Sequence, residues 1–438
     1  MNYSNKKWYK PTKLSTKIIF MIAIIFFIRL LSNIPVPFIN KDYLSALFNN
    51  TDQFSLLNNF SGGAFSQMTL MALGVTPYIT ASIVLQLLCV AFPRLKEIQH
   101  DSKDESEKRW KLITVATGII LSIIQSVGIA ISLGKQGLFT KYSFLPVLIV
   151  CALWVIGELI IILAGEYISK YLIGNGVSII LAVNIIVGLP NDLSAFYQTY
   201  ILNKPLTTII LSTVILLLIV FMLVVFTVVL TNAGKEIPVV YPNNNLSANQ
   251  KNIATIPIKL NAAGVMPIIF ASTLFSLPLM FTKNNAVQKL LSSHNWYDLS
   301  NPIGFIGLFI YFILTIAFAY FYTSITFIPA EIANRLRKKG ATISGIRPGK
   351  PTEEYLHNKS KYMTGIGAVM LFMLTQIPTI ITCVTDIYSL SFGGTSIIIV
   401  IGVIVETTAV IKSELLIRSY SKKSLTFFGI NTKKAINN

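Results

Sequence analysis

The sequence predicts an all-α polytopic membrane protein with ten membrane-spanning helices. Of its 438 residues, 53% are hydrophobic and only 12% are charged, whereas soluble domains carry about 25% charged residues. The apolar residues gather in segments near the ~20 residues that cross ~30 Å of hydrocarbon. Further spans follow the first, so we expect no removable signal peptide. The ten predicted spans are residues 18–38, 68–92, 112–133, 145–165, 172–189, 207–231, 263–281, 302–328, 362–384 and 393–415.

The distribution of Lys and Arg predicts that both termini are cytoplasmic. With the N-terminus inside, the inner segments hold 29 of the 36 basic residues, the outer segments hold 6, and Arg29 lies in the first span. Cytoplasmic loops typically carry such an excess. The net charge of +18 therefore indicates orientation and contact with anionic lipid head groups, not nucleic acid.

No catalytic or metal-binding pattern is present in the sequence. The three cysteines lie far apart in or beside apolar spans, and the three histidines are scattered among polar loops. This spacing predicts neither a disulfide framework nor a metal cluster. No nucleophile is paired with a base, so we expect no enzyme and no cofactor.

The predicted spans are nearly free of ionisable residues. Arg29 lies near the outer end of the first span, where a long side chain can reach the interface, and Glu166 and Glu406 lie near cytoplasmic ends. Glu158, near the middle of the fourth span, is the exception. It is either a proton site or, more commonly, a carboxyl that is protonated or bonded to a neighbouring helix. A pore lined by aliphatic side chains suits a gate that blocks ions by dewetting.

An internal repeat divides the chain into two five-span halves. "GVTPYITASIV" at 74–84 and "GVMPIIFASTL" at 264–274 share six of eleven positions without a gap. They fall in spans of opposite direction, which is typical of an inverted repeat with its pathway between the halves. The proline after each glycine indicates either an ordinary first turn of a helix or the start of a short, interrupted helix.

The repeat and the charges predict the organisation of the chain. A semi-polar segment at 54–74 is an external loop or a re-entrant piece, and re-entry would imply a central cavity. The predicted parts are an N-terminal tail (1–17), an N-terminal half (18–190), a C-terminal half (191–415) with cytoplasmic loops at 232–262 and 331–361, and a C-terminal tail (416–438).

Five motifs follow one another along the chain: "SGGAFSQMTLMALGVTPYITASIVLQLL", "IGNGVSII", "LNAAGVMPIIFAS", "FYTSITFIPAEIANRLRKKGATISGIRPGKPTEEYL" and "FGGTSIIIVIGVIVET". In this order they resemble segments of the SecY family of protein-translocation channels, and the resemblance runs from about residue 15 to 420. It implies a central pore between the two halves, through which unfolded polypeptides cross the membrane. It also implies a lateral gate at spans 2–3 and 7–8, through which transmembrane segments leave sideways.

The resemblance implies site residues for the pore and its closure. A ring of aliphatic side chains forms the constriction, and the spacing of four within the second and fifth spans puts each pair on one helix face. Residues 56–70 match the plug, which closes the outer side of the constriction. The implied residues are Ile79, Ile83, Val177, Leu181, Ile269 and Ile399 in the ring, Gly62, Gly63 and Ser66 in the plug, and Thr80 and Asn261 as polar residues of the lateral gate.

The polar stretch "SGIRPGKPTEEYL" at 344–356 lies in the most basic cytoplasmic loop. Its Gly and Pro residues predict a compact turn with Arg347 at the tip, where a planar guanidinium can form bidentate hydrogen bonds. The resemblance implies docking of a motor ATPase or a ribosome here. The implied docking residues are Arg335, Arg337, Lys338, Lys339, Arg347 and Lys350.

The resemblance implies the bacterial plasma membrane and a set of partners: SecE and SecG-like small subunits, the SecA motor, the ribosome, unfolded preproteins with signal peptides, and membrane lipids. The loops "RLKEIQHDSKDESEKRWK" and "NNNLSANQKN" depart from the family pattern. The sequence is therefore compatible with two subtypes, a housekeeping SecY and an accessory SecY that exports few substrates. The alternative class, a secondary transporter with inverted repeats, predicts more polar residues at mid-span.

Overall fold

The computed structural model describes residues 14–427 apart from 45–54, 93–94, 96–97, 100–103, 135, 141, 203, 242–253, 282–301 and 386–387. The described chain is mostly helical, which confirms the predicted class. The helices of the N-terminal half are α1 (Leu14–Leu31), α3 (Ser55–Ser61), α4 (Thr76–Ala91), α6 (Asp104–Gly134), α7 (Phe144–Tyr171) and α8 (Gly176–Tyr200).

In the described part of the second half there are six helices and a small sheet. The helices are α9 (Leu206–Asn232), α10 (Met266–Phe281), α12 (Pro302–Thr326), α13 (Pro329–Lys338), α14 (Lys350–Thr385) and α15 (Tyr388–Phe427). The strands are β1 (Gly234–Val240), β2 (Ala254–Lys259) and β3 (Thr342–Ile343). The predicted boundary between the halves, at residue 190, falls inside α8.

Seven helices of the described chain are long and apolar enough to cross a membrane. Three shorter apolar helices, Thr76–Cys89, Gly176–Pro190 and Met266–Phe275, lie where the second, fifth and seventh spans were predicted. At 1.5 Å per residue, the 16 residues of α4 cover only ~24 Å. All ten predicted positions are therefore helical, but a count of ten complete spans stays a prediction.

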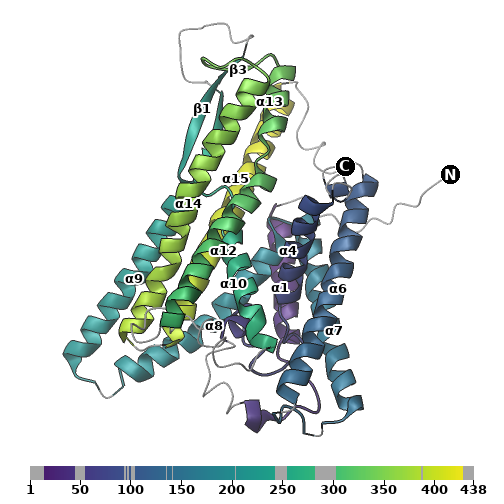
Figure 1. Cartoon of the computed structure of the whole chain (residues 1–438), viewed down its shortest axis with the longest axis vertical. Helices are drawn as coiled ribbons and strands as arrows, with labels where there is room; N and C mark the ends of the chain where they lie inside the picture. The colour runs from purple at the N-terminus through teal and green to yellow at the C-terminus, as the bar shows by residue number, and fades with distance from the viewer. Residues whose placement is uncertain are drawn as a thin grey trace, which may run out of the picture.

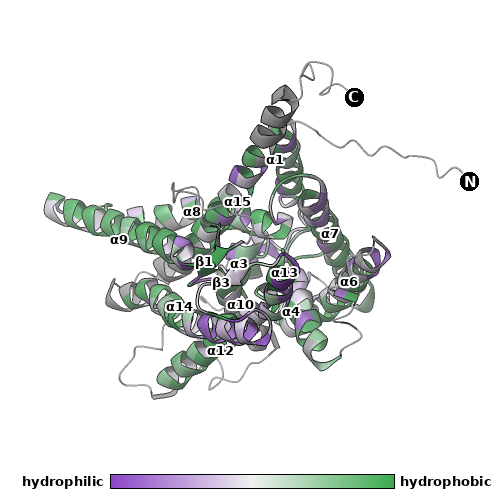
Figure 2. Ribbon diagram, turned by 90° about the horizontal axis from the view of Figure 1, so that it is seen from above, coloured by the Kyte–Doolittle hydropathy of each residue, from purple (hydrophilic) through white to green (hydrophobic). Residues whose placement is uncertain are grey.

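The helices form two groups with a short helix between them. Helices α1, α4, α6 and α7 lie together, and α9, α12, α14 and α15 lie together beside them (Figure 1). Seen from above, α3 lies near the middle of the molecule (Figure 2), where it contacts α4, α8 and α15. Helix α8 contacts both α7 and α15, so it joins the two groups.

Both copies of the repeat have the same backbone path. Gly74 (φ +60°) and Gly264 (φ +64°) adopt left-handed conformations that suit glycine far better than any other residue. Two residues later α4 and α10 begin, and each is 16 residues long. The structure therefore favours the second reading of the repeat, a pair of short, interrupted helices.

A glycine supports the segment before each interrupted helix. A Cβ atom at Gly157 of α7 would collide with the carbonyl oxygen of Leu70, four residues before Gly74. A Cβ atom at Gly367 of α14 would collide in the same way with the carbonyl oxygen of Leu260. The non-helical backbone thus rests directly on a neighbouring helix in both halves.

The small sheet was not predicted from the sequence. Its strand order is β2-β1-β3, all antiparallel, and Val239 pairs with Ile343. This pairing joins the two predicted cytoplasmic loops, 232–262 and 331–361, into one unit with α13 at one end of the molecule (Figure 1). Its buried core consists of Ile237, Val239, Ile258, Leu336, Ala341, Ile343 and Leu356.

Replacing Gly157 with alanine should destabilise the protein. Overpacking typically costs about 1–3 kcal/mol, which outweighs the preference of a helix for alanine over glycine. The midpoint of thermal unfolding of the detergent-solubilised protein measures the effect. Gly188→Ala on α8 is the control, because its Cβ would lie 3.6 Å from the nearest atom, Asn59 Oδ1. An unchanged midpoint for Gly157→Ala would contradict this packing.

Candidate functional site: an aliphatic constriction between the two halves

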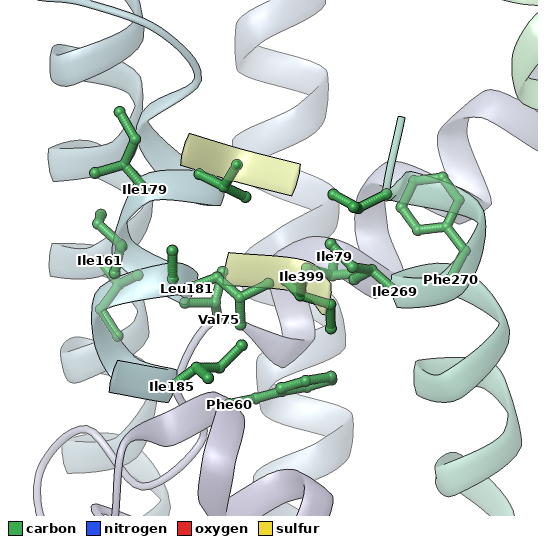
Figure 3. Packing of buried hydrophobic residues seen from close by; sticks show 14 of the residues in the cluster. Phe60, Val75, Ile79, Ile161, Ile179, Leu181, Ile185, Ile269, Phe270 and Ile399 are labelled. Atoms are coloured by element: carbon green, nitrogen blue, oxygen red, sulfur yellow. The ribbon is translucent and has the colours of Figure 1, made fainter. Parts of the chain in front are cut away.

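The six predicted ring residues come together in one hydrophobic cluster between the two halves of the chain. They project from α4, α8, α10 and α15, and Figure 3 shows four of them, Ile79, Leu181, Ile269 and Ile399, directed toward one another. All but Val177 are buried, with at most 5% of their surface exposed. Val177 is partly buried and packs against the others.

The interrupted helices give two of these residues equivalent positions. The backbone N–H of Ile79 donates to the carbonyl oxygen of Val75, at 3.1 Å, and that of Ile269 donates to Val265, at 3.2 Å. Each isoleucine therefore lies in the first turn of its helix, five residues after the repeat glycine. Val75 and Val265 join the same cluster. We had not predicted these valines as site residues, although the repeat aligns them.

The plug segment lies directly against the ring. Phe60 of α3 belongs to the same cluster with 1% of its surface exposed, and it lies next to Ile185 beyond the ring residues (Figure 3). Gly62 (φ +66°) and Gly63 (φ +85°) turn the chain back after α3. At Ser66, the backbone N–H donates to Asn58 Oδ1 and Oγ donates to the Gly63 carbonyl oxygen, both at 2.9 Å.

The expectation that Arg29 extends to the membrane interface is wrong. Its guanidinium turns inward and donates hydrogen bonds to Asn184 of α8 and to the carbonyl oxygen of Gly62. Fixed oxygens of the protein therefore hold its charge. Asn184 was missed because one amide in an apolar helix carries no local signal of its partner.

The two predicted gate residues are both buried, but no described hydrogen bond joins them. Thr80 donates to the carbonyl oxygen of Thr76 at 2.9 Å. It also accepts a long hydrogen bond, 3.5 Å, from Nε2 of Gln125 on α6. Helix α10 contacts both α4 and α6, so Thr80 and Gln125 lie on helices that meet the second half. Asn261 lies in the turn between β2 and α10, five residues before α10 begins. Gln125 was not predicted, although it is an amide inside an apolar helix.

The predicted docking residues are all exposed at the end of the molecule that carries the sheet. Arg347 lies on a turn between Gly345 (φ +80°) and Gly349 (φ +103°). Thr352 Oγ1 donates to the Arg347 carbonyl oxygen at 2.8 Å, which fixes the turn. The Arg347 side chain faces solvent. The exposed residues are Arg335, Arg337, Lys338, Lys339, Arg347 and Lys350.

Glu158 of α7 is buried, with 1% of its surface exposed. Its carboxyl group lies near the backbone of Tyr78, in the first turn of α4. No side-chain partner of the carboxyl is found within the described part of the chain. Glu158 is not one of the predicted ring or plug residues. Among the residues that the structure describes, no group of three His, Cys, Asp or Glu side chains could hold a metal ion.

The family of the chain follows from comparison with known proteins. A family model described as SecY matches residues 69–408. This chain belongs to the SecY family. It is a multi-pass membrane protein and a channel subunit of a protein translocase, and these matches do not favour the transporter alternative.

Curated SecY proteins match along nearly their whole length. The protein translocase subunit SecY of Staphylococcus carnosus is 32% identical over 424 residues, covering 94% of this chain and 97% of the relative. The subunit of Chlamydia trachomatis is 33% identical over 442 residues, covering 94% and 96%. The similarity therefore includes both halves and the constriction between them.

Solved structures share the fold of this SecY protein. A structure described as a protein conducting channel matches with a TM-score of 0.62 at 19% identity, covering 92% of this chain and 94% of the other. A second, with the same identity and coverage and a TM-score of 0.59, is described as a SecY protein whose plug domain stabilises the closed channel and maintains a membrane seal. Sec61 in the canine ribosome-channel complex matches with a TM-score of 0.59 at 17% identity.

Proposed function

We propose that unfolded polypeptides cross the membrane through the ring of aliphatic side chains between the two halves of this SecY protein. The observation that carries the proposal is the convergence of ring residues from four helices on one point, with Phe60 of the plug packed against them. Such a ring adapts to side chains of any kind because aliphatic contacts have no preferred direction. It also excludes ions, because a narrow apolar constriction does not stay wet.

The channel performs no covalent chemistry in this proposal. The plug and the ring leave the path when a polypeptide enters, and the work of moving the chain comes from outside the membrane. A cytosolic motor such as SecA, or a translating ribosome, supplies it. SecE and SecG-like small subunits complete the complex in the bacterial plasma membrane.

Lateral release uses the contact of α10 with α4 and α6. Thr80 and Gln125 are buried on α4 and α6, and Asn261 is buried in the turn before α10. The hydrogen bond between Thr80 and Gln125 lies within the N-terminal half, so separation of the halves would leave it intact. Opening there would expose mainly apolar surface to lipid, which costs little in a membrane. A hydrophobic segment of a passing chain can then leave sideways.

The exposed basic residues on α13 and around Arg347 form the docking surface for the motor or the ribosome. The surface lies on the unit built from β1, β2, β3 and α13, which we assign to the cytoplasm because of its basic charge. Arginine suits this role because its guanidinium forms two parallel hydrogen bonds to a carboxylate or a phosphate. A housekeeping and an accessory SecY would share this arrangement and differ in the partner that docks.

Photo-crosslinking tests the path. A photoreactive amino acid replaces Ile269 or Leu181 in the ring, and the lipid-facing Leu217 of α9 is the control position. A precursor that carries a tightly folded C-terminal domain is arrested during export, so that its chain stays in the channel. We expect crosslinks to the precursor from both ring positions and none from Leu217, which is 64% exposed on an outer helix. Export of the precursor without a crosslink at either ring position would contradict the proposal.

Charge reversal at Arg347 tests the docking surface. We expect Arg347→Glu to lower the initial rate of export at least ~tenfold, because like charges at an interface slow association and cost several kcal/mol. Thermal stability should not change, since the side chain is exposed. Lys361→Glu, at another exposed cation on α14, is the control. A normal export rate for Arg347→Glu would remove this residue from the docking surface.

A further inference from the structure

Three hydrogen bonds connect the plug, α1 and α8, and two of them reach the plug itself. Arg29 Nη2 donates to the carbonyl oxygen of Gly62 at 3.0 Å. Arg29 Nη1 donates to Asn184 Oδ1, also at 3.0 Å. Asn184 Nδ2 in turn donates to the carbonyl oxygen of Phe60, at 2.9 Å. One cation and one amide, from two helices of the N-terminal half, therefore hold two main-chain oxygens of the plug.

Both donor side chains depend on the plug for their partners. Asn184 is almost completely buried, with 3% of its surface exposed, and Arg29 is partly buried. Burying such groups is costly unless their hydrogen bonds are made. Within the described chain, no ion pair includes Arg29, so neutral oxygens hold its charge. Hydrogen bonds from a charged donor are stronger than those between neutral groups.

Gly62 lets the guanidinium approach the plug backbone. A Cβ atom there would lie 2.5 Å from Arg29 Nη1, 2.9 Å from Nη2 and 3.0 Å from the Asn184 carbonyl oxygen. The next residue, Gly63, also has a positive φ, but a Cβ atom on it would have no atom within 4 Å. The two adjacent glycines therefore differ in what they contribute. Both allow the turn, but only Gly62 makes room for Arg29.

We propose that Arg29 and Asn184 form a latch that holds the plug in the closed channel. The proposal rests on the proposed function, since a latch needs a channel that opens. The latch binds only main-chain oxygens of the plug. It therefore depends on the backbone conformation of the plug and not on the identity of its side chains. Opening breaks the bonds to Phe60 and Gly62. The bond between Arg29 and Asn184 lies outside the plug and keeps the donors aligned for its return.

The resting open probability of single channels in planar lipid bilayers tests the latch, with the full-length chain in complex with its small subunits. Arg29→Ala, Asn184→Ala and Gly62→Ala should each raise it roughly tenfold, the effect of losing one hydrogen bond to the plug. Arg29→Ala combined with Gly62→Ala should exceed the larger single effect only slightly, because both changes break the same contact.

Two matched controls separate the latch from general damage. Lys17→Ala removes another cation from α1, one that pairs with Glu414 at 2.6 Å and does not touch the plug. Gly63→Ala also places an alanine at a positive φ, +85° against +66° at Gly62, without the collision. We expect a wild-type open probability for Lys17→Ala and a smaller rise for Gly63→Ala than for Gly62→Ala.

Two results would overturn the latch: wild-type open probability in both Arg29→Ala and Asn184→Ala, or an equal rise in Gly62→Ala and Gly63→Ala. If Arg29→Ala does not accumulate in the membrane, the open probabilities of Asn184→Ala and Gly62→Ala decide the test. The crosslinks from the ring to an arrested precursor report on the channel separately. A protein that gives those crosslinks but fails this test is a channel without the latch.

Discussion

The rest of the structure depends on a dry contact among aliphatic side chains at the point where the two halves meet. Two short helices, α4 and α10, begin next to this contact and bring Ile79 and Ile269 to it from equivalent repeat positions. The non-helical segments before these helices can lie within the membrane only if they are buried in protein. Close packing on Gly157 and Gly367 provides that burial.

Charged groups lie beside this contact but not among the side chains that form it. Next to the ring, Arg29 and Asn184 bind main-chain oxygens of the plug, and at the far end of the molecule the basic residues around Arg347 are exposed. A charge within the ring would keep the constriction wet. This separation lets the ring exclude ions while charged groups hold the plug and meet the partners that drive transport.

The sequence predicted the features that depend on local composition. Apolar length located the helices. The repeat marked where two equivalent helices begin, with interrupted helices as one of two interpretations, while the ring came from resemblance to SecY proteins. Arg29 was misjudged because its direction depends on Asn184, 155 positions away. The sheet was missed because Val239 pairs with Ile343 across α10, α12 and α13, although burial alternates along the end of β1. Such long-range contacts leave little trace in a single sequence.

The resting ion conductance of a ring variant tests the central claim most directly. In Ile79→Ser combined with Ile269→Ser, two symmetry-related hydroxyls replace aliphatic surface at the constriction. The account predicts a clear rise in resting conductance across planar bilayers, because the constriction becomes wet. The matched pair Ile79→Val and Ile269→Val, which keeps the surface aliphatic, should conduct like the wild type. A serine variant as tight as the wild type would contradict a seal made by these side chains.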